Sequence, residues 1–152
     1  NRLANVVPIQ KMLWSEARQM DLYLSGNAAS HSAYFDPFYS STGKSIRVEA
    51  DTLDNMLESA GIQSVDFIKM DIEGSEIEAL KGMKKSLEHG PQMMIAAYHP
   101  VEGKASHLTI VPQLEQLGFS VQYSDGIVRA QPGDLIEDKK ARDGRHRRDT
   151  GI

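Results

Sequence analysis

The feature that most constrains the fold is a buried strand that leads through a glycine turn directly into a helix. Residues 65–72 read VDFIKMDI, a short apolar run typical of a buried strand. Gly74 lets the backbone turn sharply. Ser75 and Glu78 form a capping box, which predicts a helix over residues 76–89. A strand followed at once by a helix indicates an α/β fold built from such units.

The rest of the chain predicts further strands and helices in alternation. We predict strands at residues 6–14, 20–25, 45–50 and 92–98, helices at 53–60 and 111–117 (Pro112 in the first turn), and a hairpin at 119–123 and 127–130. This order indicates a mostly parallel sheet with helical crossovers. Residues 26–44 form a long loop. A solvated insertion pinned by its aromatic residues and a substrate lid both fit that loop.

Composition and charge exclude several classes of protein. The 152 residues fit one domain, and 40% apolar with 25% charged residues is ordinary globular composition. The absence of cysteine excludes a disulfide scaffold, a thiolate metal site and a cysteine nucleophile. A net charge of −4 argues against a general nucleic-acid binder. No apolar run approaches the ~20 residues that a membrane span needs, so we expect no membrane partner.

We divide the chain into a domain over residues 1–132 and a charged tail over residues 133–152. The tail lacks an apolar face, so we expect it to be disordered. The chain starts at Asn1 without a basic-then-apolar leader. We therefore expect a cytoplasmic protein, of which this chain is a fragment or a trimmed form.

Polar side chains gather where two neighbouring strands end. Asp71 and Glu73 follow the strand at 65–72, and His99 follows the strand at 92–98. In an open parallel sheet, ligands bind beyond the carboxyl ends of the strands. Two carboxylates and an imidazole in that crevice could serve as base and acid, or bind a divalent cation. We therefore take these three residues as the candidate catalytic site.

Plainer interpretations stay open for the same residues. Glu76 fits the stabilisation of a helix start as well as a functional role. His99 stands before Pro100 and fits a turn residue equally well. Trp14 fits core packing better than stacking on an adenine.

Residues 66–82, DFIKMDIEGSEIEALKG, resemble the strand–turn–helix signature of the FkbM-type S-adenosylmethionine-dependent methyltransferases. The similarity extends over roughly residues 1–132. It implies a Rossmann-like class I methyltransferase sheet of seven strands that ends in an antiparallel hairpin. It also implies transfer of a methyl group, often to a hydroxyl oxygen. Asp71 and Glu73 would then lie beside donor and acceptor, and we expect Asp71, Trp14 and Ser15 to contact the cofactor.

The sequence departs from that family at its cofactor-binding region. No Gly-x-Gly occurs in the chain, which begins after the family's first two strands. Those strands lie in the middle of the family's sheet, so the edge at residues 67–70 would be apolar and unpaired. We therefore predict weak binding of S-adenosylmethionine. We also predict self-association, or a rearranged sheet in which residues 6–14 pair with residues 67–70.

Three classes of function remain. The first is an S-adenosylmethionine-dependent methyltransferase acting on a hydroxyl of a sugar, a lipid, a polyketide or a small metabolite. The second is a metal-dependent hydrolase that uses Asp71, Glu73 and His99. The third is a non-catalytic fragment or interaction module that pairs with another chain through its open edge.

Overall fold

The computed structural model describes residues 5–27, 30–34, 42–134 and 136–138, and it has a mixed α/β fold. Its larger sheet has four strands in the order β4-β5-β9-β8. Their bounds are Phe67–Met70 (β4), Gln92–Ala96 (β5), Phe119–Ser124 (β8) and Ile127–Pro132 (β9). β4 and β5 are parallel, whereas β9 is antiparallel to both of its neighbours. Three of the four strands therefore run in the same direction.

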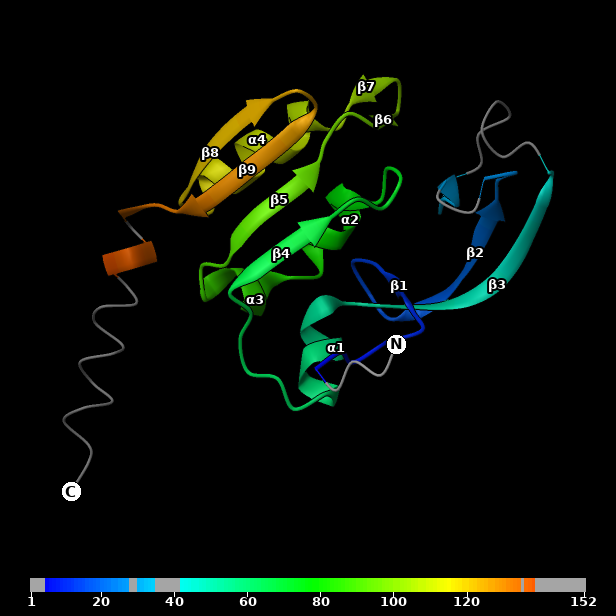
Figure 1. Cartoon of the computed structure of the whole chain (residues 1–152), viewed down its shortest axis with the longest axis horizontal. Coiled ribbons are helices and arrows are strands. Elements are labelled where there is room, and N and C mark those ends of the chain that lie inside the picture. The colour runs from blue at the N-terminus through cyan, green and yellow to red at the C-terminus, as the bar shows by residue number, and fades with distance from the viewer. Residues whose placement is uncertain (1–4, 28–29, 35–41, 135, 139–152) are drawn as a thin grey trace.

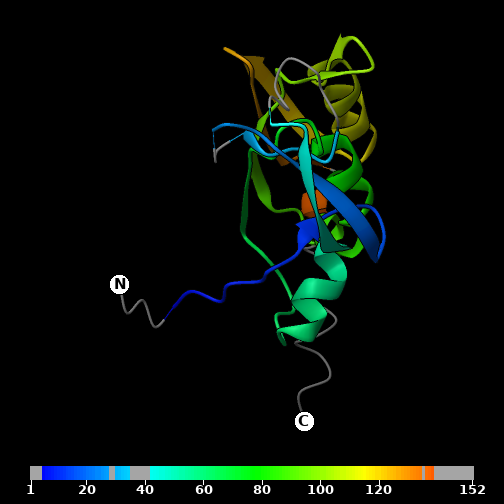
Figure 2. The same ribbon diagram turned by 90° about the vertical axis from the view of Figure 1, so that its right-hand side faces the viewer.

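Three helical segments cover one face of this sheet (Figures 1 and 2). They are α2 (Glu76–Lys81), α3 (Lys84–Glu88) and α4 (His107–Gln116). Side chains alternate between the two faces, so Ile68 and Met70 of β4 are buried while Phe67 is exposed. The main core lies between sheet and helices, and its fully buried members include Leu80, Met83, Ile95, Ile110, Leu114 and Val128.

A second sheet of three strands lies beyond the β4 edge of the first (Figure 1). It contains β1 (Met12–Leu13), β2 (Arg18–Leu24) and β3 (Lys44–Asp51), followed by helix α1 (Leu53–Ser59). β2 and β3 are antiparallel, and β1 runs parallel to the end of β3. A short third sheet pairs β6 (Pro100–Val101) with β7 (Lys104–Ala105).

The segment that follows β1 makes a close backbone contact with the residue that follows α2. A Cβ atom added to Gly82 would lie 2.2 Å from the carbonyl oxygen of Trp14, so only glycine fits there. Trp14 forms a small core with Met20 and Ala50, while Leu13 packs against the main core. This contact fixes the second sheet against the end of α2.

The helix predicted over residues 76–89 is divided at Gly82, which is a correction to the sequence analysis. The close contact with the Trp14 carbonyl is at Gly82. The N-terminus of α3 is capped separately, by the side chain of Asp54. The carboxylate of Asp54 accepts hydrogen bonds from the backbone N–H groups of Lys85 and Ser86, both at 2.9 Å. The predicted capping box is also wrong, because Ser75 makes no side-chain hydrogen bond to the helix.

The strand predicted at residues 6–14 is reduced to β1, and its predicted pairing with β4 is wrong. β1 pairs with β3 instead, with Leu13 opposite Asp51. The Asp51 carboxylate accepts a hydrogen bond from Lys11 Nζ at 2.9 Å, which holds the incoming chain against β3. β4 therefore pairs with β5 alone among the described strands, and its outer edge is open.

The second half of the chain follows the predicted order, with changes at β6 and β7, at the start of α4 and after β9. The hairpin of β8 and β9 turns at Asp125 and Gly126, which have φ of 53° and 77°. α4 begins at His107 instead of residue 111, so Pro112 lies inside the helix and not in its first turn. Ile136, from the predicted tail, is buried in the main core, whereas residues 139–152 lie outside the described residues. Within the described part of the chain, none of the helices has the length and apolar character to cross a membrane.

We expect the chain to self-associate through the open edge of β4, because unpaired apolar edge strands add to one another. Phe67 on this strand is 54% exposed. A Phe67→Lys substitution places a charge on the strand and should shift the chain toward the monomer in sedimentation velocity. Leu108→Lys makes the same change on α4, where the side chain is 60% exposed, and should leave the distribution unchanged. A wild-type chain that stays monomeric at every concentration would contradict this expectation.

Candidate functional site

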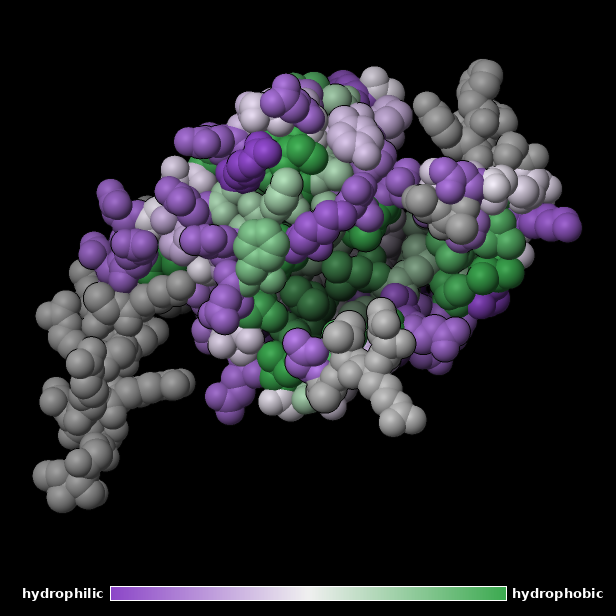
Figure 3. Space-filling view, viewed as in Figure 1, coloured by the Kyte–Doolittle hydropathy of each residue, from purple (hydrophilic) through white to green (hydrophobic). Residues whose placement is uncertain are grey.

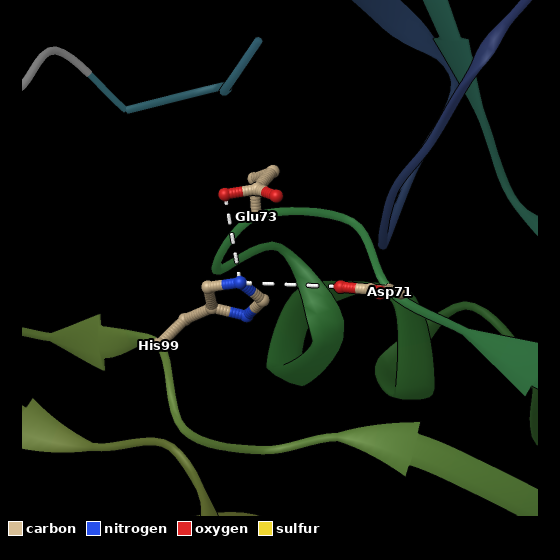
Figure 4. A group of neighbouring side chains, drawn as sticks. All are labelled: Asp71, Glu73 and His99. Atoms are coloured by element: carbon tan, nitrogen blue, oxygen red, sulfur yellow. Dashed lines mark ion pairs between the residues drawn. The ribbon is translucent and has the colours of Figure 1, made fainter. Parts of the chain in front are cut away.

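The structure brings together the three side chains that the sequence analysis selected at the strand ends. β4 and β5 are parallel neighbours, with Met70 opposite Ile95, so the residues that follow them emerge at the same edge. Asp71, Glu73 and His99 each offer one ligand atom, and these atoms lie within 4.8 Å of one another. Figure 4 shows both carboxylates directed toward the imidazole.

The turn after β4 has a constrained backbone. Glu73 has a φ of 54°, a left-handed conformation that costs a non-glycine residue free energy. Gly74 follows with a φ of 94°. These two residues reverse the chain between β4 and α2, and they place the Glu73 side chain over His99 (Figure 4).

A hydrogen bond from a distant segment holds this turn. The Ser32 hydroxyl donates to the carbonyl oxygen of Glu73 at 2.8 Å and accepts from the N–H of Tyr34 at 3.1 Å. Ser32 itself exchanges two backbone hydrogen bonds with Tyr23 of β2. The part of the 26–44 loop that the structure describes is thus attached to both β2 and the candidate site.

His99 lies between carboxylates on both sides of its ring. Its Nε2 is 3.5 Å from Oε2 of Glu73 and 4.0 Å from Oδ1 of Asp71. On the other side, Nδ1 is 3.2 Å from Oε1 of Glu76. The imidazole is buried, with a side chain 10% exposed, whereas the side chains of Asp71 and Glu73 are 37% and 30% exposed. Solvent therefore reaches the site from the side of Asp71 and Glu73.

Glu76 is the site residue that the sequence analysis did not select. Its side chain is fully buried, and its Oε1 accepts a hydrogen bond from the N–H of Ile72 at 3.0 Å. A glutamate at the first position of a helix is ordinarily exposed, so the sequence offered no signal of this burial beyond its proximity to Glu73. Glu76 lies at the Nδ1 side of the ring, and the carboxylates of Asp71 and Glu73 lie at the Nε2 side.

These charges determine the protonation of the imidazole. Burial lowers the pKa of His99, but the nearby carboxylates of Glu76, Glu73 and Asp71 raise it by more, so the pKa lies above its usual 6.5. The site therefore combines an imidazole that readily holds a proton with two solvent-accessible carboxylates. This arrangement can accept and relay a proton, or bind a cation.

Trp14 and Ser15 lie elsewhere, against the side of α2. The Trp14 ring is buried, 6.0 Å from the ring of Tyr34 between centroids. Burial raises the pKa of Glu78, but hydrogen bonds from Lys81 and Ser15 outweigh it and lower that pKa. Within the described residues, no hydrogen bond or ion pair joins Trp14 or Ser15 to the candidate site. Their contact with a cofactor stays a prediction.

Comparison with known proteins yields one family. The model of the Methyltransferase FkbM domain matches residues 9–121, which is most of the chain and includes every candidate site residue. No curated protein and no solved structure matches the chain.

We predict that Glu73→Gln lowers the pKa of His99 in an NMR titration in metal-free buffer, because one of the charges that raises it is removed. A folded pKa above the unfolded value means that the charged ring stabilises the fold. That contribution is complete below about pH 6.5 and is lost as the pH rises through the folded pKa. Urea denaturation should therefore separate wild type from Glu73→Gln more at about pH 6 than at about pH 9.

The control for this titration is Asp66→Asn, which removes an exposed carboxylate from the opposite end of β4. It should leave the pKa of His99 unchanged. An unaltered pKa in Glu73→Gln would show that this carboxylate does not face the ring in solution.

Proposed function

Because the chain belongs to the FkbM methyltransferase domain family, we propose that it transfers the methyl group of S-adenosylmethionine to a hydroxyl oxygen. The acceptor is a sugar, a lipid or a small metabolite. The single observation that carries the proposal is the cluster of Asp71, Glu73 and His99, which lies inside the matched region. The comparisons give no support to a metal-dependent hydrolase or a non-catalytic module, so we propose neither.

The carboxylates of Asp71 and Glu73 orient the acceptor hydroxyl in this proposal. S-adenosylmethionine supplies an electrophilic methyl group on a sulfonium, so the acceptor oxygen has to lose its proton as the new C–O bond forms and the C–S bond breaks. Glu73 accepts this proton, and His99 at 3.5 Å is placed to exchange it. Holding the oxygen lone pair in line with the methyl group supplies a large part of the rate.

The proposal includes a Rossmann-like sheet that continues beyond β4. Three parallel strands and an open β4 edge support this arrangement, since two further strands would pair there. Figure 3 shows hydrophobic residues gathered in a hollow between the two larger sheets. Strands added to β4 would cover this surface.

We predict transfer of radiolabel from S-adenosylmethionine, at saturating concentration, to an alcohol within a panel of sugars, lipids and small metabolites. The product should be a base-stable methyl ether, which distinguishes a hydroxyl acceptor from a carboxylate. Asp71→Asn and Glu73→Gln should each lower kcat by about 10²–10⁴-fold, the range for loss of a general base or its partner. Asp66→Asn should keep the wild-type rate, and label on nitrogen would contradict the proposal.

We also predict that the 152-residue chain binds S-adenosylmethionine weakly. No Gly-x-Gly occurs in the sequence, so no turn of that kind cradles the donor. Calorimetric titration should give a Kd above the micromolar range. A micromolar Kd would mean that residues such as Trp14 and Ser15 suffice for the donor.

A further inference from the structure

We propose that Asp71, Glu73 and His99 form a binding site for a first-row divalent cation, of which Zn²⁺ fits best. The three ligand atoms are Oδ1 of Asp71, Oε2 of Glu73 and Nε2 of His99 (Figure 4). They come from the end of β4, the turn that follows it, and the segment after β5. Cation binding does not require methyl transfer, so this proposal can be tested without a donor or an acceptor.

The two distances to Nε2 approach those of a tetrahedral cation site, and all three ligand atoms lie within 4.8 Å of one another. Zinc bonds of about 2.0–2.2 Å to nitrogen and oxygen place neighbouring tetrahedral ligands roughly 3.4 Å apart. The separation of Nε2 from the Glu73 oxygen is 3.5 Å, and its separation from the Asp71 oxygen is 4.0 Å. A small movement of the Asp71 side chain, which is 37% exposed, closes the second distance. Three protein ligands leave the fourth position open to solvent or substrate.

The chemistry of the ligands favours zinc over magnesium. Imidazole is a good ligand for zinc, whereas sites for Mg²⁺ use oxygen atoms.

Lys69 does not occupy the Asp71 oxygen that is proposed to bind the cation. Its Nζ lies 3.5 Å from Oδ2 of Asp71, whereas Oδ1 is directed at His99.

His99 provides a second observation that points to a ligand. Its side chain is nine-tenths buried, and neither of its ring nitrogens meets hydrogen-bond geometry with a partner among the described residues. Nε2 is directed at carboxylate oxygens, which only accept when ionised. A cation between them satisfies all three groups at once, as a proton on Nε2 also does, whereas an unprotonated Nε2 without a cation satisfies none of them.

Glu76 supplies the outer contact that metal-binding histidines commonly have. A ligating histidine usually donates its other ring N–H to a carboxylate, which fixes the ring and its tautomer. Glu76 Oε1 lies 3.2 Å from Nδ1, and this glutamate is fully buried. In the proposed site the Nδ1 proton faces Glu76, which leaves the lone pair of Nε2 for the cation.

The bound cation also bears on the proposed function. An acceptor hydroxyl in the open coordination position would lose its proton more readily, because a bound cation lowers the pKa of a coordinated hydroxyl. This step rests on methyl transfer being the reaction, whereas cation binding does not. It replaces the proton relay through Glu73 and His99, because the cation then occupies their ligand atoms.

The test is calorimetric titration of the chelator-treated chain with Zn²⁺ and, separately, with Mg²⁺. We expect one Zn²⁺ per chain and at least tenfold weaker binding of Mg²⁺. Asp71→Asn, Glu73→Gln and His99→Gln should each weaken Zn²⁺ binding by tenfold or more. Glu76→Gln should weaken it by about 10–100-fold, as expected for an outer contact. Asp66→Asn should bind Zn²⁺ as wild type does.

A second measurement uses the wild-type chain alone, so it stands even if a variant fails to fold. Zn²⁺ should shift the NMR signal of the His99 Nε2 nitrogen and leave the ring signals of His89, which follows α3, unchanged. Absence of stoichiometric Zn²⁺ binding, equal affinity in wild type and the three ligand variants, or an unshifted Nε2 signal would each overturn the site. Methyl transfer that persists in excess chelator would leave the proposed function intact and would show that the reaction does not need the cation.

Discussion

The candidate site depends on the parallel pairing of β4 with β5. This pairing aligns Met70 with Ile95, so two polar segments that are distant in sequence leave the sheet at the same edge. An antiparallel pairing would send them to opposite ends. The buried side chains of both strands pack against the helices on one face, so the position of the site is set by the main core rather than by the loops.

The ionisable side chains of the candidate site differ in their exposure to solvent. The imidazole and Glu76 lie inside, and Asp71 and Glu73 lie at the surface. The mutual repulsion of the three carboxylates is tolerated because they surround one titratable ring, which can hold a proton or, in our proposal, contact a cation. Within the described ion pairs, Lys69 is the one lysine or arginine at this cluster.

The sequence predicted the elements of this site better than their detailed contacts. The convergence of Asp71, Glu73 and His99 followed from the rule that parallel strands end at one edge of a sheet. The role of Glu76 could not be read in this way, because its burial and its contact with His99 are tertiary features that no local sequence pattern marks. Gly82, where α2 and α3 divide, lies against the carbonyl group of Trp14, a contact between segments far apart in the chain. Local sequence patterns predict the helices and strands, whereas tertiary contacts of this kind determine where some of them end.

The hydroxyl of Ser32 links the described start of the 26–44 loop to the carbonyl oxygen of Glu73. Two positions 41 residues apart in the chain thus share one bond at the centre of the site. Because the acceptor is a backbone oxygen, the turn depends on the side chain at position 32 and not on the one at position 73 for this bond. A residue without a hydroxyl at position 32 therefore loosens the backbone that carries Glu73, even though Ser32 itself supplies no ligand atom to the proposed site.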